Sequence, residues 1–183
     1  MADTARIGVI TAPRESNGGT HCAFFYGTLM APEVFFTVCY RTARVPEAIA
    51  RLHDFRPALL KGYCRRRVRS ADYPGIVEDA GHEVRGTYVT GLTDANMAHL
   101  DRFEGSEYER RTVRVRVLVP RIGEAEGSAG VDYVEGEEQE AEVYVYLYRD
   151  QLEEKEWDFE HFRQEKLRAW TRDGLEFDPF EVL

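Results

Sequence analysis

One alternating segment constrains the fold of this chain more than any other part of its sequence. Between residues 111 and 119, valine occupies every second position from Val113 onward, and Arg114, Arg116 and Leu118 stand between the valines. Successive side chains of a β-strand point to opposite faces, so this period of two predicts a half-buried strand, which Pro120 ends. A half-buried strand needs a sheet around it.

Other segments supply the strands that such a sheet requires. The apolar run from Ala23 to Tyr26 is rich in aromatic residues, and residues 83–92 and 143–148 alternate in the same way as the central segment. Aromatic and β-branched residues suit a pleated, partly buried surface. The predicted strands are residues 23–26, 58–63, 64–70, 83–92, 111–119 and 143–148.

Helical periodicity appears between these strands. Thr93 predicts an N-cap for a helix over residues 94–103, because its hydroxyl can accept an amide hydrogen of the first turn, and Gly105 stops that helix. Residues 32–40 favour a helix, although their β-branched and aromatic content leaves a strand open. The other predicted helices are residues 46–53 and an amphipathic segment, 157–170, expected to lie across the sheet. Strands and helices without regular alternation indicate the α+β class.

The length of 183 residues suits one domain. Residues 1–20 contain little to bury, so we expect a flexible N-terminal extension followed by a single domain over residues 21–183. Residues 121–140 are rich in Gly and Glu and poor in apolar residues, which predicts a long mobile loop within that domain.

Charge and cysteine content narrow the partners and the compartment. The formal net charge of −9 disfavours nucleic acid and anionic membranes, because phosphates favour a basic surface. Three cysteines without close paired spacing indicate reduced thiols and a cytoplasmic protein. We see no secretory signal peptide and no stretch near the roughly 18 apolar residues of a membrane span. We expect a monomer or a weak homodimer.

Two short stretches carry the candidate chemistry. Gly27 lets the backbone turn or approach a ligand closely, and the amides of Gly27, Thr28 and Leu29 would then be free to bind an anion or a carbonyl. Glu104 continues the apolar stripe of Met97 and Leu100, so its carboxylate is aimed inward. Burial would raise its pKa toward the range of a general base. The alternative is a structural helix-end carboxylate that accepts hydrogen bonds from a tyrosine or the backbone.

Competing chemistries find less support. The five histidines show no pair at metal-ligand spacing, and no dinucleotide or phosphate-binding fingerprint is present, so we expect no metal and no cofactor. Tyr108 stands where a nucleophile elbow after Ser106 would need glycine. The arginines of residues 65–69 are interpreted as a solvated strand face, or as one arginine that pairs a substrate carboxylate.

The order of several motifs resembles the gamma-glutamylcyclotransferase-like family, in particular its plant and fungal avirulence-induced-gene-type branch. The motifs are Tyr26-Gly27-Thr28-Leu29, Tyr73-Pro74-Gly75-Ile76-Val77, Val84-Arg85-Gly86, and the run from Leu100 to Arg110. The resemblance covers residues 23–119 and returns at 143–148; it fails at the N-terminus and at residues 121–140.

This resemblance implies a small mixed β-barrel flanked by helices, with a ligand cavity at its mouth. It implies Glu104 as the catalytic residue, in its Leu100-Asp101-Arg102-Phe103-Glu104-Gly105 context, whereas Asp101 is interpreted as structural. It places Tyr26, Tyr108 and, less firmly, Tyr73 at the cavity wall beside the amides of residues 27–29.

The implied activity is release of 5-oxoproline from a small-molecule gamma-glutamyl conjugate by intramolecular acyl transfer. Glu104 would take a proton from the substrate's own α-amino group, which attacks the gamma-carbonyl, and would return the proton to the departing amine. The alternative is a non-enzymatic, stress-related binding protein that keeps the cavity.

Overall fold

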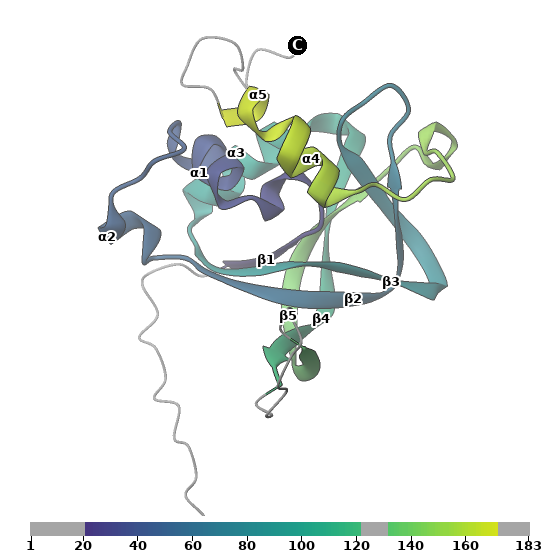
Figure 1. Ribbon diagram of the computed structural model, residues 1–183, viewed down its shortest axis with the longest axis horizontal. Coiled ribbons are helices and arrows are strands. Elements are labelled where there is room, and N and C mark those ends of the chain that lie inside the picture. The colour runs from purple at the N-terminus through teal and green to yellow at the C-terminus, as the bar shows by residue number, and fades with distance from the viewer. Residues whose placement is uncertain (1–20, 122–131, 172–183) are drawn as a thin grey trace, which may run out of the picture.

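Five strands form the sheet in the computed structural model, which describes residues 21–121 and 132–171 (Figure 1). They are β1 (His21–Phe25), β2 (Asp54–Arg67), β3 (Pro74–Leu92), β4 (Tyr108–Pro120) and β5 (Tyr133–Tyr146). Their order is β1-β3-β2-β4-β5, and the sheet closes because β5 pairs with β1 in parallel, through Ala23 and Glu142. All the other pairings are antiparallel among the described strands. The predicted α+β class and small mixed barrel with flanking helices are confirmed.

Helices α1, α3, α4 and α5 gather on one side of this sheet (Figure 1). The helices are α1 (Pro32–Tyr40), α2 (Glu47–Ala50), α3 (Asp94–Glu104), α4 (Phe159–Glu165) and α5 (Leu167–Thr171), with 3-10 turns η1 (Thr28–Met30), η2 (Gly105–Glu107) and η3 (Arg149–Gln151). The predicted helix over residues 32–40 is confirmed, as is the Thr93 cap, whose hydroxyl accepts from the Asn96 amide.

Several predicted element boundaries are wrong. Residues 58–63 and 64–70 are not two strands, because β2 runs through Gly62, where φ of +83° allows a bulge between Lys61 and Tyr63. The strand predicted at 83–92 begins at Pro74, since β2 pairs with it over its whole length. The segment 157–170 is two short helices, α4 and α5, instead of one.

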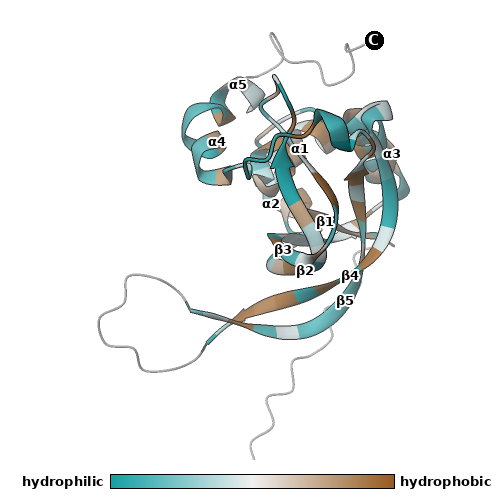
Figure 2. Cartoon of the chain, turned by 90° about the vertical axis from the view of Figure 1, so that its right-hand side faces the viewer, coloured by the Kyte–Doolittle hydropathy of each residue, from teal (hydrophilic) through white to brown (hydrophobic). Residues whose placement is uncertain are grey.

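The predicted loop over residues 121–140 is also wrong for residues 133–140, which belong to β5. Two of their glutamates pair with basic residues of β4 and β2: Glu138 pairs with Arg114 and Arg116 of β4 at 3.0 Å and 3.1 Å, and Glu135 pairs with Lys61 of β2 at 2.7 Å. Such cross-strand ion pairs stabilise this strand, although its Gly- and Glu-rich composition is typical of a loop. Figure 2 shows β4 and β5 reaching beyond the rest of the sheet. Residues 1–20 and 122–131, where the extension and the rest of the loop were predicted, lie outside the described residues.

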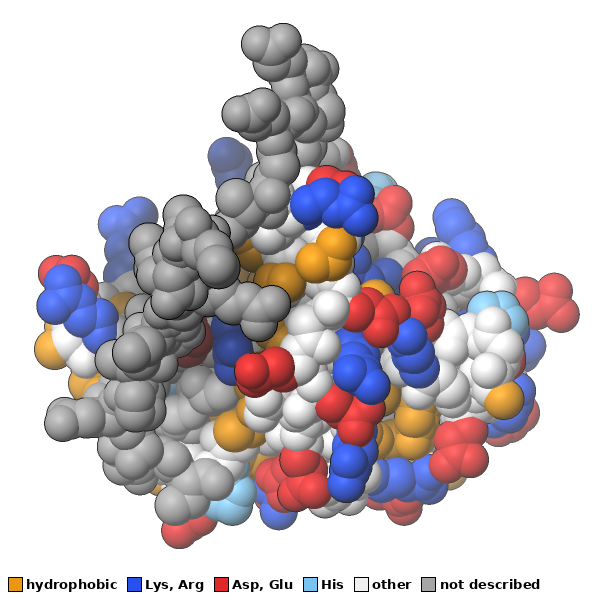
Figure 3. Space-filling view, turned by 90° about the horizontal axis from the view of Figure 1, so that it is seen from below, with side chains coloured by type: hydrophobic (Ala, Val, Ile, Leu, Met, Phe, Trp, Pro, Cys, Tyr) orange, Lys and Arg blue, Asp and Glu red, His pale blue; other side chains and the backbone are white. Residues whose placement is uncertain are grey.

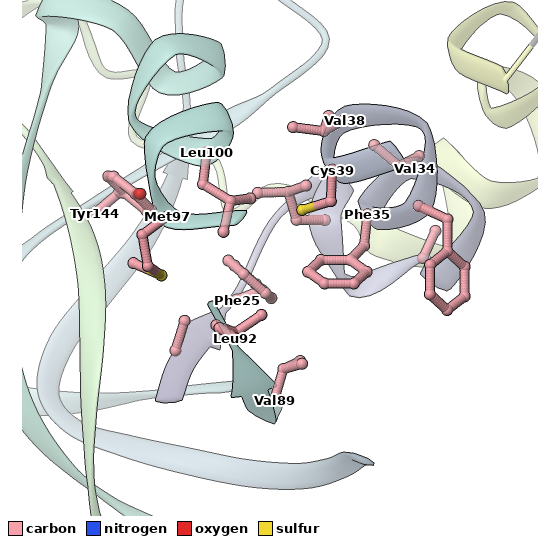
Figure 4. Packing of buried hydrophobic residues seen from close by; sticks show 14 of the residues in the cluster. Phe25, Val34, Phe35, Val38, Cys39, Val89, Leu92, Met97, Leu100 and Tyr144 are labelled. Carbon is pink, nitrogen blue, oxygen red and sulfur yellow. The ribbon is translucent and has the colours of Figure 1, made fainter. Parts of the chain in front are cut away.

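Strand β1 lies at the centre of the packing because both of its faces are buried. Phe24 belongs to a cluster of side chains inside the barrel, and Phe25 belongs to a second cluster between the sheet and the helices. Figure 4 shows Phe35 of α1 and Leu100 of α3 converging on Phe25 from two sides. The turn that follows β1 is thereby fixed to the core on both faces.

Charged side chains of both signs share the surface. Acidic and basic side chains are intermixed on the face shown in Figure 3. None of the helices in the described part of the chain combines the length and the apolar character that crossing a membrane requires.

Candidate active site

A cavity of about 480 Å³ opens where the end of β1 meets the end of α3. All seven residues predicted for the site line it: Tyr26, Gly27, Thr28, Leu29, Tyr73, Glu104 and Tyr108. They come from four separate segments of the chain, which the barrel and its flanking helix bring together. The other lining residues are Phe24, Phe25, Pro74, Arg102, Phe103, Gly105, Ser106, Glu107, Tyr144 and Trp170.

Glu104 is the last residue of α3 and presents a carboxyl group to the cavity. Gly105, with φ of +68°, ends the helix directly after it. Burial raises the pKa of Glu104 to about 8, because a charged carboxylate loses its hydration there. Between the described residues, no hydrogen bond or ion pair to the Glu104 carboxyl is found.

The turn after β1 explains why glycine stands at position 27. The φ of Gly27 is −121°, so no left-handed conformation requires glycine. A Cβ on Gly27 would instead lie 2.9 Å from Cγ of Pro74, which is closer than van der Waals contact allows. Gly27 is therefore a place of close approach between the end of β1 and the start of β3.

The 3-10 turn η1 follows Gly27 directly. Its first internal bonds run from the Met30 amide to the Gly27 carbonyl at 3.0 Å and from the Ala31 amide to the Thr28 carbonyl at 3.1 Å. The amides of Thr28 and Leu29 precede these donors and have no acceptor within the turn. Both residues line the cavity.

Two of the predicted tyrosines use their hydroxyls to fix the wall. The Tyr26 hydroxyl donates to the carbonyl of Tyr144 at 2.6 Å, and the Tyr108 hydroxyl donates to the carbonyl of Pro74 at 2.8 Å. Burial raises the pKa of each phenol well above its usual value. For Tyr26 the Glu104 charge is the next largest cause of the raised pKa. These residues offer ring surface to a ligand, and their hydroxyl protons are held by the backbone.

Tyr73 has a different partner from the other two tyrosines. Its hydroxyl donates to Glu107 Oε2 at 3.1 Å, and burial together with the Glu107 charge raises the pKa of Tyr73 to about 12. Glu107 itself lines the cavity and was not predicted, although it lies inside the segment that carries the resemblance.

The C-terminal wall of the cavity was also missed. Trp170 of α5 packs edge-on against Phe103 at 6.1 Å between ring centroids, and both line the cavity. Only the folded arrangement brings α5 against the end of α3, so no local sequence signal announced this contact. Arg65, one of the arginines considered for a substrate carboxylate, is not among the lining residues and binds the Tyr26 carbonyl from outside.

Burial raises the pKa of the Cys39 thiol to about 12, which removes its reactivity as a nucleophile near neutral pH. Among the residues that the structure describes, no group of three His, Cys, Asp or Glu side chains is placed to hold a metal ion.

Comparison with known proteins agrees with this arrangement. The family model described as "Gamma-glutamyl cyclotransferase, AIG2-like" matches residues 23–161. Protein AIG2 C of Arabidopsis thaliana is 32% identical over 167 residues, which cover 89% of this chain and 86% of that protein. AIG2-like protein C of the same plant is 32% identical over 142 residues, covering 77% of this chain and 68% of the relative. A solution structure of a further Arabidopsis thaliana protein is 26% identical, with a TM-score of 0.52 over 79% of this chain and 80% of that one.

Proposed function

Because this chain belongs to the gamma-glutamyl cyclotransferase, AIG2-like family, we propose that it releases 5-oxoproline from a gamma-glutamyl amine or amino-acid conjugate. The observation that carries the proposal is the Glu104 carboxyl, which lines the cavity without a protein partner among the described residues and has a pKa raised to about 8 by burial. A group with these properties is suited to take and return a proton near neutral pH.

The reaction needs only one proton shuttle. The carboxylate of Glu104 takes a proton from the substrate's α-amino group, whose nitrogen lone pair attacks the gamma-carbonyl carbon. A new C–N bond closes the five-membered ring, the old amide C–N bond breaks, and Glu104 returns the proton to the departing nitrogen. No external oxidant, water or cofactor enters this balance. Holding the amine and the carbonyl in contact supplies much of the acceleration.

The amides of the η1 turn are suited to stabilise negative charge on the substrate and in the transition state. Thr28 and Leu29 line the cavity, and we propose that their N–H groups donate to the substrate carboxylate or to the carbonyl oxygen as it gains charge. The surrounding aromatic walls exclude water and strengthen each of these interactions. We further propose a small-molecule substrate and a cytoplasmic location.

A panel of gamma-glutamyl amino acids, peptides, polyamines and ε-lysine conjugates, assayed for 5-oxoproline, tests the proposal. Wild-type protein should convert at least one class, and Glu104→Gln should lose about a hundredfold or more of that turnover, the usual scale for removal of a general base. Glu47→Gln, which changes an exposed carboxylate on α2, is the matched control and should keep full activity.

Calorimetry on the same proteins separates an enzyme from a binding protein. Glu104→Gln should still bind a gamma-glutamyl compound, because the base acts mainly in the transition state. Wild-type protein that binds such compounds and converts none would support the binding-protein alternative. Wild-type protein that neither binds nor converts them would remove this substrate class altogether.

A further inference from the structure

We propose that Glu107 binds the α-ammonium group of the gamma-glutamyl substrate and thereby places that amine beside Glu104. This inference rests on the proposed function and assigns a second carboxylate of the same cavity. Glu104 exchanges the proton, and Glu107 holds the group from which the proton comes.

Glu104 and Glu107 line the same cavity and stand close together in the chain. Glu104 ends α3 and Glu107 ends η2, three residues later, after the turn that Gly105 makes with φ of +68°. The main chain of Glu107 is held in place because its carbonyl accepts the Leu147 amide at 2.9 Å. Tyr73 lies near both side chains: its hydroxyl bonds to Glu107, and the Glu104 charge contributes to its raised pKa. We infer that one small cation bound in the cavity can lie close to both carboxyl groups.

Two phenols orient the Glu107 carboxylate. The Tyr73 hydroxyl donates to Oε2 at 3.1 Å, and the Tyr146 hydroxyl lies 3.4 Å from Oε1 and 3.0 Å from Oε1 of Gln151, so it shares its hydrogen between them. A carboxylate has about four acceptor positions, so both oxygens keep capacity for an additional donor. A group already held in this way loses little side-chain entropy when it binds a ligand.

The charges of the lining residues favour this assignment of the ammonium. The γ-glutamyl head carries one carboxylate and one ammonium, and the charged residues in the cavity lining are Arg102, Glu104 and Glu107. Before the substrate binds, the Glu104 carboxyl holds its own proton near neutral pH, because burial raises its pKa to about 8. Glu107, bonded by hydroxyl donors, is the carboxylate that remains for the incoming cation.

Binding of the cation then prepares Glu104 for its task. An ammonium group close to Glu104 favours the ionised form of that carboxyl, which releases its proton to solvent and becomes a base. It next takes one proton from the ammonium, and the neutral amine attacks the gamma-carbonyl. Glu104 returns that proton to the departing nitrogen, then takes the excess proton that remains on the ring nitrogen and releases it to the departing amine or to solvent. Glu107 makes the same contact before and during the reaction, so its contribution is to ground-state binding and it should affect KM more than kcat.

The test compares two ligands that differ only at the amine, in a protein that cannot turn them over. In Glu104→Gln, calorimetry would measure the Kd of gamma-glutamyl ethylamide and of glutaric acid mono-ethylamide, which keeps the carboxylate and the amide but lacks the amine. We expect the first to bind at least about tenfold more tightly, the scale of a charge-assisted hydrogen bond. Adding Glu107→Gln should bring this ratio close to one, and the control addition Glu109→Gln, whose carboxylate on β4 pairs with Arg111 and does not line the cavity, should leave it unchanged.

The outcomes separate the two proposals. If Glu104→Gln binds neither amide, the proposed substrate class fails and the inference fails with it. If the ratio persists after Glu107→Gln, or if both ligands weaken equally, Glu107 has only a structural role and the proposed function stands without this inference.

A second variant guards against misfolding of Glu107→Gln. Glu107→Asp, which keeps the charge on a shorter side chain, should retain part of the amine preference in the same binding measurement. On the catalytically intact background, Glu107→Gln should raise KM about tenfold and leave kcat within about threefold. A loss confined to kcat would overturn the assignment.

Discussion

The Arg65 guanidinium donates to the main-chain carbonyl of Tyr26 across 2.9 Å, directly before the Gly27 turn. Its side chain is only 11% exposed, its other Nη pairs with Glu156 at 3.2 Å, and it lies 5.6 Å from the ring centre of Trp157. The C-terminal segment is thus connected through one arginine to the turn that supplies the cavity amides. Arg65 lies behind the site and shapes it through Tyr26.

Replacing Arg65 should disturb the turn more than the fold. In Arg65→Met the Tyr26 carbonyl loses a charged donor, a bond worth about 1.5–3 kcal/mol, and we expect kcat/KM to fall about tenfold or more. Arg65→Lys should recover only part of this, because lysine lacks the planar fork. Arg66→Met, whose arginine bonds to the Glu154 carbonyl, is the control. Equal activities in the two methionine variants would contradict this role.

Gly27→Ala should impair activity through its contact with Pro74. The added methyl would meet the proline ring at 2.9–3.0 Å, which forces the end of β1 and the start of β3 apart. Steady-state kinetics should show a loss in kcat/KM that is smaller when Pro74→Ala removes the ring first. Penalties that simply add would show that the clash is not the cause.

The pH dependence of turnover should report Glu104. A general base works when it is ionised, so kcat/KM should rise with pH through the pKa of about 8 that burial gives this carboxyl. The measurement is a pH–rate profile from about pH 4 to about pH 9 with one gamma-glutamyl substrate. A rise centred near the ordinary pKa of glutamate, about 4.3, would show that the carboxyl is solvated.

Stability should change with pH in the opposite sense. The folded protein holds the Glu104 proton up to about pH 8, whereas the unfolded chain releases it near 4.5. The folded state therefore binds more protons between these values, and the stabilisation present below about pH 4.5 is lost as pH rises to about 8, by at most about 1.4 kcal/mol per pH unit. Denaturant titrations should show that Glu104→Gln removes this slope. An unchanged slope would assign it to other groups.

Trp170 should influence the choice of leaving group. It lines the cavity from α5, beyond the residues 23–161 that the family model matches. Trp170→Leu keeps an apolar side chain against Phe162 but removes aromatic surface, so KM should rise more for aromatic leaving groups than for aliphatic ones. Kinetics with a gamma-glutamyl anilide and a gamma-glutamyl alkylamide would measure the difference, and equal changes in both KM values would count against it.

Local patterns predicted the elements whose signals lie within a few residues. Helix α1 begins and ends where the apolar spacing after Pro32 predicted, and the Thr93 cap and the Gly105 stop frame α3 as the sequence indicates. The resemblance added the meeting of the Gly27 turn with Glu104, which are far apart in sequence and line one cavity.

Features that depend on distant partners escaped the sequence. Residues 133–140 look like a loop because their glutamates gain strand stability only from basic residues on β4 and β2. Trp170 reads as one more apolar position of an amphipathic helix until α5 packs beside Phe103. Glu107 resembles a solvated surface residue, and only the contact with Tyr73 reveals its place in the cavity.

The parallel pair between Ala23 and Glu142 makes one side of the barrel a seam held by few bonds. The Tyr26 hydroxyl crosses the same seam to reach the Tyr144 carbonyl, and the cavity opens beside it, with the Gly27 turn on one edge and Tyr144 on the other. A ligand that contacts both edges would link the end of β1 to β5 across this seam. Ligand binding should therefore slow the exchange of the β1 amide hydrogens with solvent, although β1 itself takes no part in the reaction.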